Sequence, residues 1–135
     1  MPGTLRARVQ LFFCIGGALM IANAFWMAAS AHHWFINIPS DLAATGAPNN
    51  HFIHDVAAAY LTFGIGLIWC AGNLEKCRPV YLGVTFFMTA HAVSHMLEML
   101  FGQLPHSHWW IDFPLVFLPA ILLVILAVPT VWRKL

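Results

Sequence analysis

Charged side chains are scarce in this sequence, where Asp, Glu, Lys and Arg together make up 8% of the 135 residues. A soluble domain averages about 25% charged residues, so this deficit excludes an ordinary soluble fold. Hydrophobic residues instead make up 61% of the chain. The formal net charge is only +1, which gives no reason to expect a nucleic acid or an acidic protein as a partner. These values indicate an integral membrane protein with a single domain over residues 1–135.

Several motifs that would specify a reaction are also absent. The three cysteines, Cys14, Cys70 and Cys77, form no C-x-x-C pair and are interpreted as small apolar fillers and a loop thiol. The sequence has no H-E-x-x-H zinc-protease motif and no phosphate-binding glycine loop, and its histidines do not form the repeated boxes of membrane desaturases. The sequence therefore leaves open whether the protein is an enzyme, and it names no substrate.

Four apolar runs are long enough to form transmembrane helices. We expect these helices at about residues 9–29, 50–72, 80–101 and 113–132, because about 20 apolar residues span a bilayer core of ~30 Å. The predicted fold is all-α, a bundle of four transmembrane helices, and Pro119 is expected to bend the fourth. The first run has a second interpretation, because Ala29-Ser30-Ala31 resembles a signal-peptide cleavage site. The run is, however, longer than the usual signal core of about 7–15 residues.

The basic residues all fall on one side of the predicted bundle. They lie before the first helix, between the second and third, and after the fourth: Arg6, Arg8, Lys76, Arg78, Arg133 and Lys134. Cytoplasmic loops of membrane proteins carry an excess of Lys and Arg. This asymmetry predicts that both termini and the middle turn are cytoplasmic.

The titratable residues gather at the opposite, outer side. All eight histidines are expected there, together with four of the five acids: Asp41, Asp55, Glu98 and Asp112. His91, His95 and Glu98 follow one another at helical spacing, so they should project from one face of the third helix. Ionisable groups are costly in hydrocarbon and usually face a bundle interior, a partner or an ion. We therefore expect a single polar pocket that opens outward.

The leading hypothesis for this pocket is a transition-metal site. Imidazole and carboxylate groups on facing helices commonly bind zinc, copper or iron in helix bundles. The candidate ligands are the histidines and carboxylates that could reach the pocket: His51, Asp55, His91, His95, Glu98 and Asp112.

Three other interpretations of the same residues remain open. The polar groups could simply hold the helices together in a non-catalytic accessory subunit, either as a homo-oligomer or beside another membrane protein. Haem b is a less favoured cofactor, bound by His91 or His95 together with His51 or His54, and a quinone-linked redox role belongs to the same hypothesis. The residues could also form a path for protons or ions.

Several short segments resemble a known family. The chain resembles small bacterial four-helix membrane proteins, broadly DoxX-like, in five places: Asn50-His51-Phe52-Ile53-His54-Asp55-Val56, Ala59-Tyr60-Leu61, His91 with His95, Ile111-Asp112-Phe113-Pro114 and Phe117-Leu118-Pro119-Ala120. The resemblance implies a multi-pass protein of the bacterial inner (plasma) membrane and implies no activity. The family often has arginine at the position of His54, and arginine could not replace a ligand there, so the resemblance makes His54 a poor candidate.

Overall fold

The computed structural model describes residues 2–39, 42 and 46–135 of the chain. Its elements are α1 (Pro2–Ala29), α2 (Ala31–Asn37), α3 (Asn50–Gly72), α4 (Arg78–Leu100), α5 (His108–Asp112), the π-helical turn η2 (Phe113–Phe117), α6 (Leu118–Ala127) and α7 (Pro129–Trp132). No β-strand occurs within these ranges. The predicted all-α fold class is therefore confirmed.

Four helical segments are long and apolar enough to cross a membrane: Gly3–Ala29, Asn50–Gly72, Arg78–Leu100 and His108–Ala127. Many of their large apolar side chains point outward, including Leu19, Phe25 and Phe86, which are 66%, 62% and 78% exposed. Surfaces of this kind are stable only against lipid or another apolar partner. The four-helix membrane bundle is thus the architecture of the chain.

Three predicted helix boundaries are wrong by more than a turn, including the end of the fourth segment, which lies at Ala127 and not at residue 132. The first helix begins at Pro2 and not near residue 9, because the helix continues beyond the apolar run through Arg6 and Arg8. The fourth helical segment begins at His108 and not at residue 113, so Asp112 lies inside it. Hydropathy marks the part of a helix that meets lipid, whereas capping and packing decide where the helix ends.

The predicted long loop between the first two spans contains the short helix α2. Its residues Trp34 and Phe35 are buried against Met27, Ile53 and Ala57, which belong to α1 and α3. The Trp34 Nε1–H also donates a hydrogen bond of 2.8 Å to Asn23 Oδ1 on α1. This packing orders a segment that was predicted to be irregular. Asp41, which was expected at the outer side, lies outside the described residues.

Helices α1 and α3 form the closest pair in the bundle. A Cβ atom added at Gly17 would lie 2.7 Å from the carbonyl oxygen of Gly64, and one added at Gly64 would lie 2.9 Å from that of Gly17. The two backbones can approach this closely only because both positions lack a side chain. The α3 helix is itself started by Asn49, whose side chain accepts a hydrogen bond of 3.1 Å from the Phe52 amide.

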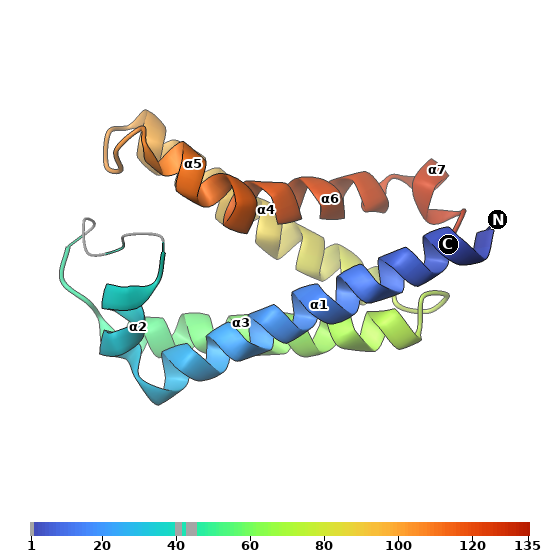
Figure 1. Cartoon of the computed structure of the whole chain (residues 1–135), viewed down its shortest axis with the longest axis horizontal. Coiled ribbons are helices and arrows are strands. Elements are labelled where there is room, and N and C mark those ends of the chain that lie inside the picture. The colour runs from blue at the N-terminus through green and yellow to red at the C-terminus, as the bar shows by residue number, and fades with distance from the viewer. Residues whose placement is uncertain (1, 40–41, 43–45) are drawn as a thin grey trace.

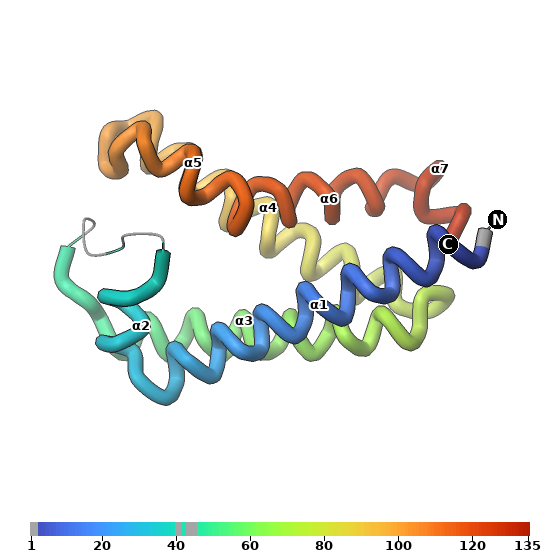
Figure 2. The backbone as a smooth tube through the Cα atoms, viewed as in Figure 1, coloured from blue at the N-terminus to red at the C-terminus, as the bar shows by residue number. Residues whose placement is uncertain are grey.

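The end of the bundle that carries the basic residues is closed. Both termini and the α3–α4 turn meet there (Figures 1 and 2). The Tyr81 ring stacks between Phe13 and Trp132, at centroid distances of 5.2 and 4.7 Å. Arg6 contacts Glu75 at 3.4 Å, and Arg78 lies over the Trp132 ring at 5.4 Å. The predicted clustering of the basic ends is confirmed; their cytoplasmic location stays a prediction.

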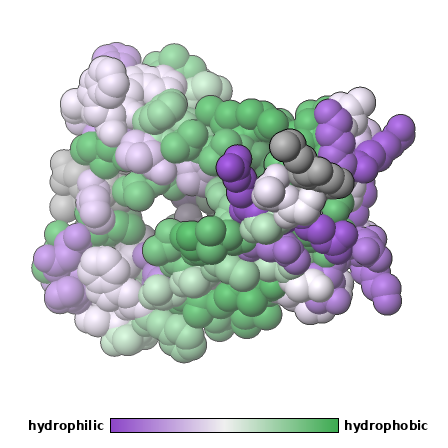
Figure 3. All heavy atoms as spheres, turned by 45° about the vertical axis from the view of Figure 1, so that its right-hand side comes forward, coloured by the Kyte–Doolittle hydropathy of each residue, from purple (hydrophilic) through white to green (hydrophobic). Residues whose placement is uncertain are grey.

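At the opposite end the helices separate into two arms. One arm consists of α1, α2 and α3, and the other of α5 with the C-terminal half of α4 (Figure 1). The space-filling view shows the molecule hollowed between these arms (Figure 3). In the described residues the helices therefore pack together at the basic end, which we call the closed end, and diverge at the end where most of the histidines lie, which we call the open end.

Candidate functional site

A buried histidine–aspartate pair joins the third and fourth spans. His95 Nδ1 on α4 lies 2.8 Å from Asp112 Oδ2 on α5, and the two side chains are 13% and 1% exposed. An ionised carboxylate only accepts hydrogen bonds, so with Asp112 ionised the Nδ1–H of His95 is the donor. The prediction that His95 reaches a carboxylate on another helix is confirmed.

The position of Asp112 follows from the spacing of the fourth segment. Asp112, Val116, Ala120 and Leu123 recur every three or four residues and are all buried, so they form the face that packs against the rest of the bundle. A π-helical turn at Phe113–Phe117, in which the Leu118 amide donates to the Phe113 carbonyl, precedes Pro119; the bend at Pro119 stays a prediction. Such turns accommodate residues that cannot continue the α-helical ladder, and they are frequent at functional sites.

Further along α4, towards the basic end, His91 connects the pair to a third helix. The His91 and His95 rings meet edge to face, with their centroids 4.6 Å apart. His91 Nε2 then lies 3.2 Å from the Tyr60 hydroxyl of α3, within hydrogen-bonding distance. We call Tyr60, His91, His95 and Asp112 the polar row. It connects three of the four spans, and Tyr60 is a member that the reasoning from titratable residues missed.

Two buried polar atoms in or beside this row have no hydrogen-bond partner among the residues that the structure describes. They are Asp112 Oδ1 and His108 Nδ1, and their residues are 0% and 2% exposed. His108 was predicted to lie in a polar turn, and its burial was not foreseen. The four-residue spacing between His108 and Asp112, which places them on one helical face, is the signal that could have indicated it.

The other predicted site residues lie apart from the polar row. His51 and Asp55 contact each other at 3.7 Å at the start of α3, but their side chains are 89% and 66% exposed. Glu98 is one turn beyond His95, and its backbone carbonyl accepts hydrogen bonds from the Gln103 and Leu104 amides. Within the described residues, no hydrogen bond or ion pair joins any of these three to His95 or Asp112.

The six proposed ligands are thus not gathered into one metal shell. No group of three or more His, Cys, Asp or Glu side chains in the described parts of the chain is placed to hold a metal ion. The expected single pocket is replaced by a buried pair with a histidine next to it and a separate exposed pair. Metal binding itself stays a prediction.

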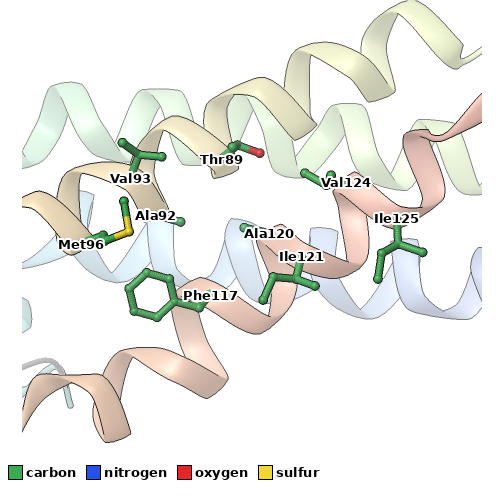
Figure 4. Close-up of a pocket in the computed structure, with 9 residues that line it drawn as sticks. All are labelled: Thr89, Ala92, Val93, Met96, Phe117, Ala120, Ile121, Val124 and Ile125. Atoms are coloured by element: carbon green, nitrogen blue, oxygen red, sulfur yellow. The ribbon is translucent and has the colours of Figure 1, made fainter.

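A groove between α4 and the segment formed by η2 and α6 is a further concave feature of the described residues. It has a volume of about 250 Å³ and is lined by apolar residues and Thr89, with Ala92 and Ala120 among the smallest. Figure 4 shows its lining side chains extending from the two helices. The groove is lined by no titratable group, so it offers no acid, no base, and no histidine or carboxylate ligand for a metal. The polar row is therefore the candidate site.

Comparison with protein-family models, curated proteins and solved structures finds no match for this chain. The DoxX-like resemblance stays a prediction.

Proposed function

We propose that this integral membrane protein takes up and releases a proton at the His95–Asp112 pair within the bilayer. The observation that carries the proposal is the 2.8 Å contact between His95 Nδ1 and Asp112 Oδ2, with the carboxylate only 1% exposed. Ionisable groups inside transmembrane segments typically mark the paths and sites of protons and ions.

A purely structural role explains this pair less well. Removing two charges from water costs several kcal/mol per ion, and apolar side chains of similar size often hold helices together at least as well. The α4–α6 contact already has such apolar residues in Ala92 and Ala120. A buried acid–base pair adds the ability to exchange a proton, which the apolar contact lacks.

The surroundings of the polar row support proton access from one side. Beyond Tyr60 and His91, towards the basic end, the Phe63 and Phe87 rings stack at 4.5 Å and the core becomes apolar. The two arms separate in the other direction, where His51 and His54 are exposed. With the basic end in the cytoplasm, the site would exchange protons with the outer face of a bacterial inner membrane.

Infrared titration of the protein in lipid tests the proposal directly. We expect a protonated-carboxyl band that is lost in Asp112→Asn and that shifts its titration midpoint in His95→Gln. Asp55→Asn is the matched control, because Asp55 is an exposed carboxylate beside a histidine at the same end. A titration curve unchanged by Asp112→Asn would refute proton exchange at this site.

A second candidate function, transition-metal binding, is favoured by the orientation of His95. A histidine that donates Nδ1–H to a carboxylate presents Nε2 for coordination, as in many zinc sites, and His91 lies one turn away. Zinc, copper or iron would be bound by these two imidazoles, with water completing the shell.

Metal analysis of the protein purified in mild detergent separates the two functions. The metal hypothesis predicts bound metal that disappears in the double variant His91→Ala/His95→Ala and persists in His51→Ala/His54→Ala. Equal and negligible metal in all three samples would refute it. A Soret band that is lost with the first variant would instead identify haem.

A further inference from the structure

His108 is a second buried histidine at the outer end of the polar row. It stands in the first turn of α5, directly after the exposed residues Pro105, His106 and Ser107. Its side chain is nevertheless 2% exposed, and its Nδ1 atom has no hydrogen-bond partner. A buried polar atom left in this state costs about 1–3 kcal/mol, so its position needs an explanation beyond packing.

The carboxylate of Asp112 also has a buried oxygen atom without a hydrogen-bond partner among the described residues. Oδ2 is engaged by His95, whereas Oδ1 is buried without a partner. His108 and Asp112 are four residues apart on one helix and therefore lie on the same face. Asp112 thus has one imidazole bonded to it from α4, and a second imidazole without a partner for its Nδ1 among the described residues lies one helical turn away on α5.

We propose that His108 passes protons between the outer surface and Asp112, through a water molecule held between His108 Nδ1 and Asp112 Oδ1. The inference rests on the proposed proton uptake at the His95–Asp112 pair. A single water bound by these two atoms would satisfy both of them, and buried waters typically occupy polar sites of this kind. The other titratable groups near this part of the bundle are Glu98 on α4, one turn from His95, and His106 in the preceding turn.

The proton transfer balances without any other reactant. His108 accepts a proton from the outer solvent at Nε2 and becomes an imidazolium. It then gives its Nδ1 proton to the water, which gives one of its own protons to Asp112 Oδ1. The water ends as it began, His108 ends as the other neutral tautomer with its proton on Nε2, and Asp112 ends as a neutral carboxylic acid. A proton crossing in the opposite direction returns His108 to its first tautomer. The hydrogen bond from His95 Nδ1 then ends on a neutral acid in place of a carboxylate and is weaker, so proton uptake would loosen the contact between α4 and α5.

The test is the rate at which Asp112 becomes protonated after a rapid drop in pH, followed by time-resolved infrared spectroscopy of the protein in lipid vesicles. His108→Gln keeps a polar side chain but cannot carry a proton, so the rate should fall about tenfold or more. His106→Gln, at an exposed histidine of the same turn, should leave the rate unchanged. An unchanged rate in His108→Gln would overturn the role of His108 while leaving the proposed function intact.

A second variant distinguishes proton transfer from a structural role. In His108→Ala, added imidazole should restore at least part of the lost rate, because the free base can take the place of the missing side chain. A slow rate that imidazole does not restore would show that His108 only supports the fold. Failure of Asp112 to titrate in the wild-type protein would instead refute the proposed function itself.

Discussion

The basic end of the bundle and its opposite end are held together by different kinds of contact. At the basic end, aromatic rings stack across α1, α4 and α7, and Arg6 of α1 contacts both the Leu135 carbonyl at the C-terminus and Glu75 in the α3–α4 turn. At the opposite end, the arms separate: α1, α2 and α3 pack through an apolar cluster, and polar contacts join α4 to α3 and to α5. This difference implies that the basic end contributes more to stability than the contacts between the two arms.

The largest loss of stability should result from a substitution at the closed end. Tyr81 is fully buried, stacks on Phe13 and Trp132, and donates a hydrogen bond to the Leu123 carbonyl. Tyr81→Ala should therefore lower the free energy of unfolding by about 3–5 kcal/mol, the usual cost of emptying an aromatic site. Unfolding by detergent titration measures the loss. If Tyr60→Ala at the open end were equally costly, the proposed contrast between the two ends would be wrong.

A smaller loss is expected from the buried pair. Asp112→Ala leaves the His95 Nδ1–H without a partner and should cost about 1–3 kcal/mol in the same measurement. Asp55→Ala, at the exposed pair, should change stability by less than about 1 kcal/mol.

The double variant His95→Leu/Asp112→Leu tests whether the pair is needed for stability. It should recover most of the stability lost in Asp112→Ala, because two apolar side chains leave no unsatisfied polar atom. A double variant less stable than Asp112→Ala would mean that the pair is present mainly to hold the helices together.

The contact between α1 and α3 offers a matched pair of glycine substitutions. Gly17→Ala places a methyl group 2.7 Å from the Gly64 carbonyl oxygen and should cost about 1–3 kcal/mol. Gly83→Ala on α4 meets nothing within 4 Å and should stabilise the helix by up to about 1 kcal/mol. Thermal unfolding of both variants would show opposite shifts; shifts of the same sign would contradict the described packing.

The smallest effect concerns thiol chemistry at the closed end. Burial raises the pKa of the Cys77 thiol. Because a raised pKa favours the thiol over the thiolate, Cys77 should react slowly with a maleimide at pH 8 until the protein unfolds. Ser107→Cys, in the exposed turn at the open end, is the reference and should react promptly. Prompt labelling of Cys77 in the folded protein would show that the closed end opens.

Much of the candidate site could be predicted because it follows from helical periodicity. The four-residue spacing of His91 and His95 within an apolar run places both rings on one face, whatever the neighbouring helices do. The partner of His95 was among the predicted residues, although the fourth helix was expected to begin at residue 113, after Asp112. His51 and Asp55 were predicted to join the same pocket because they lie at the same end of the bundle. Position along the helix leaves the direction around the helix axis undetermined, and both side chains are exposed.

Composition and the placement of six basic residues were sufficient to determine an all-α membrane bundle whose termini and middle turn lie together, since apolar length and charge act on each segment independently. Only the tertiary structure decided that Tyr60 contacts His91, that His108 is buried and that α2 packs against α1 and α3. These features depend on which helix faces approach one another. That choice depends on contacts such as Gly17 against Gly64 and on the turn around Pro114 and Pro119, which join residues far apart in the chain or alter the helical period.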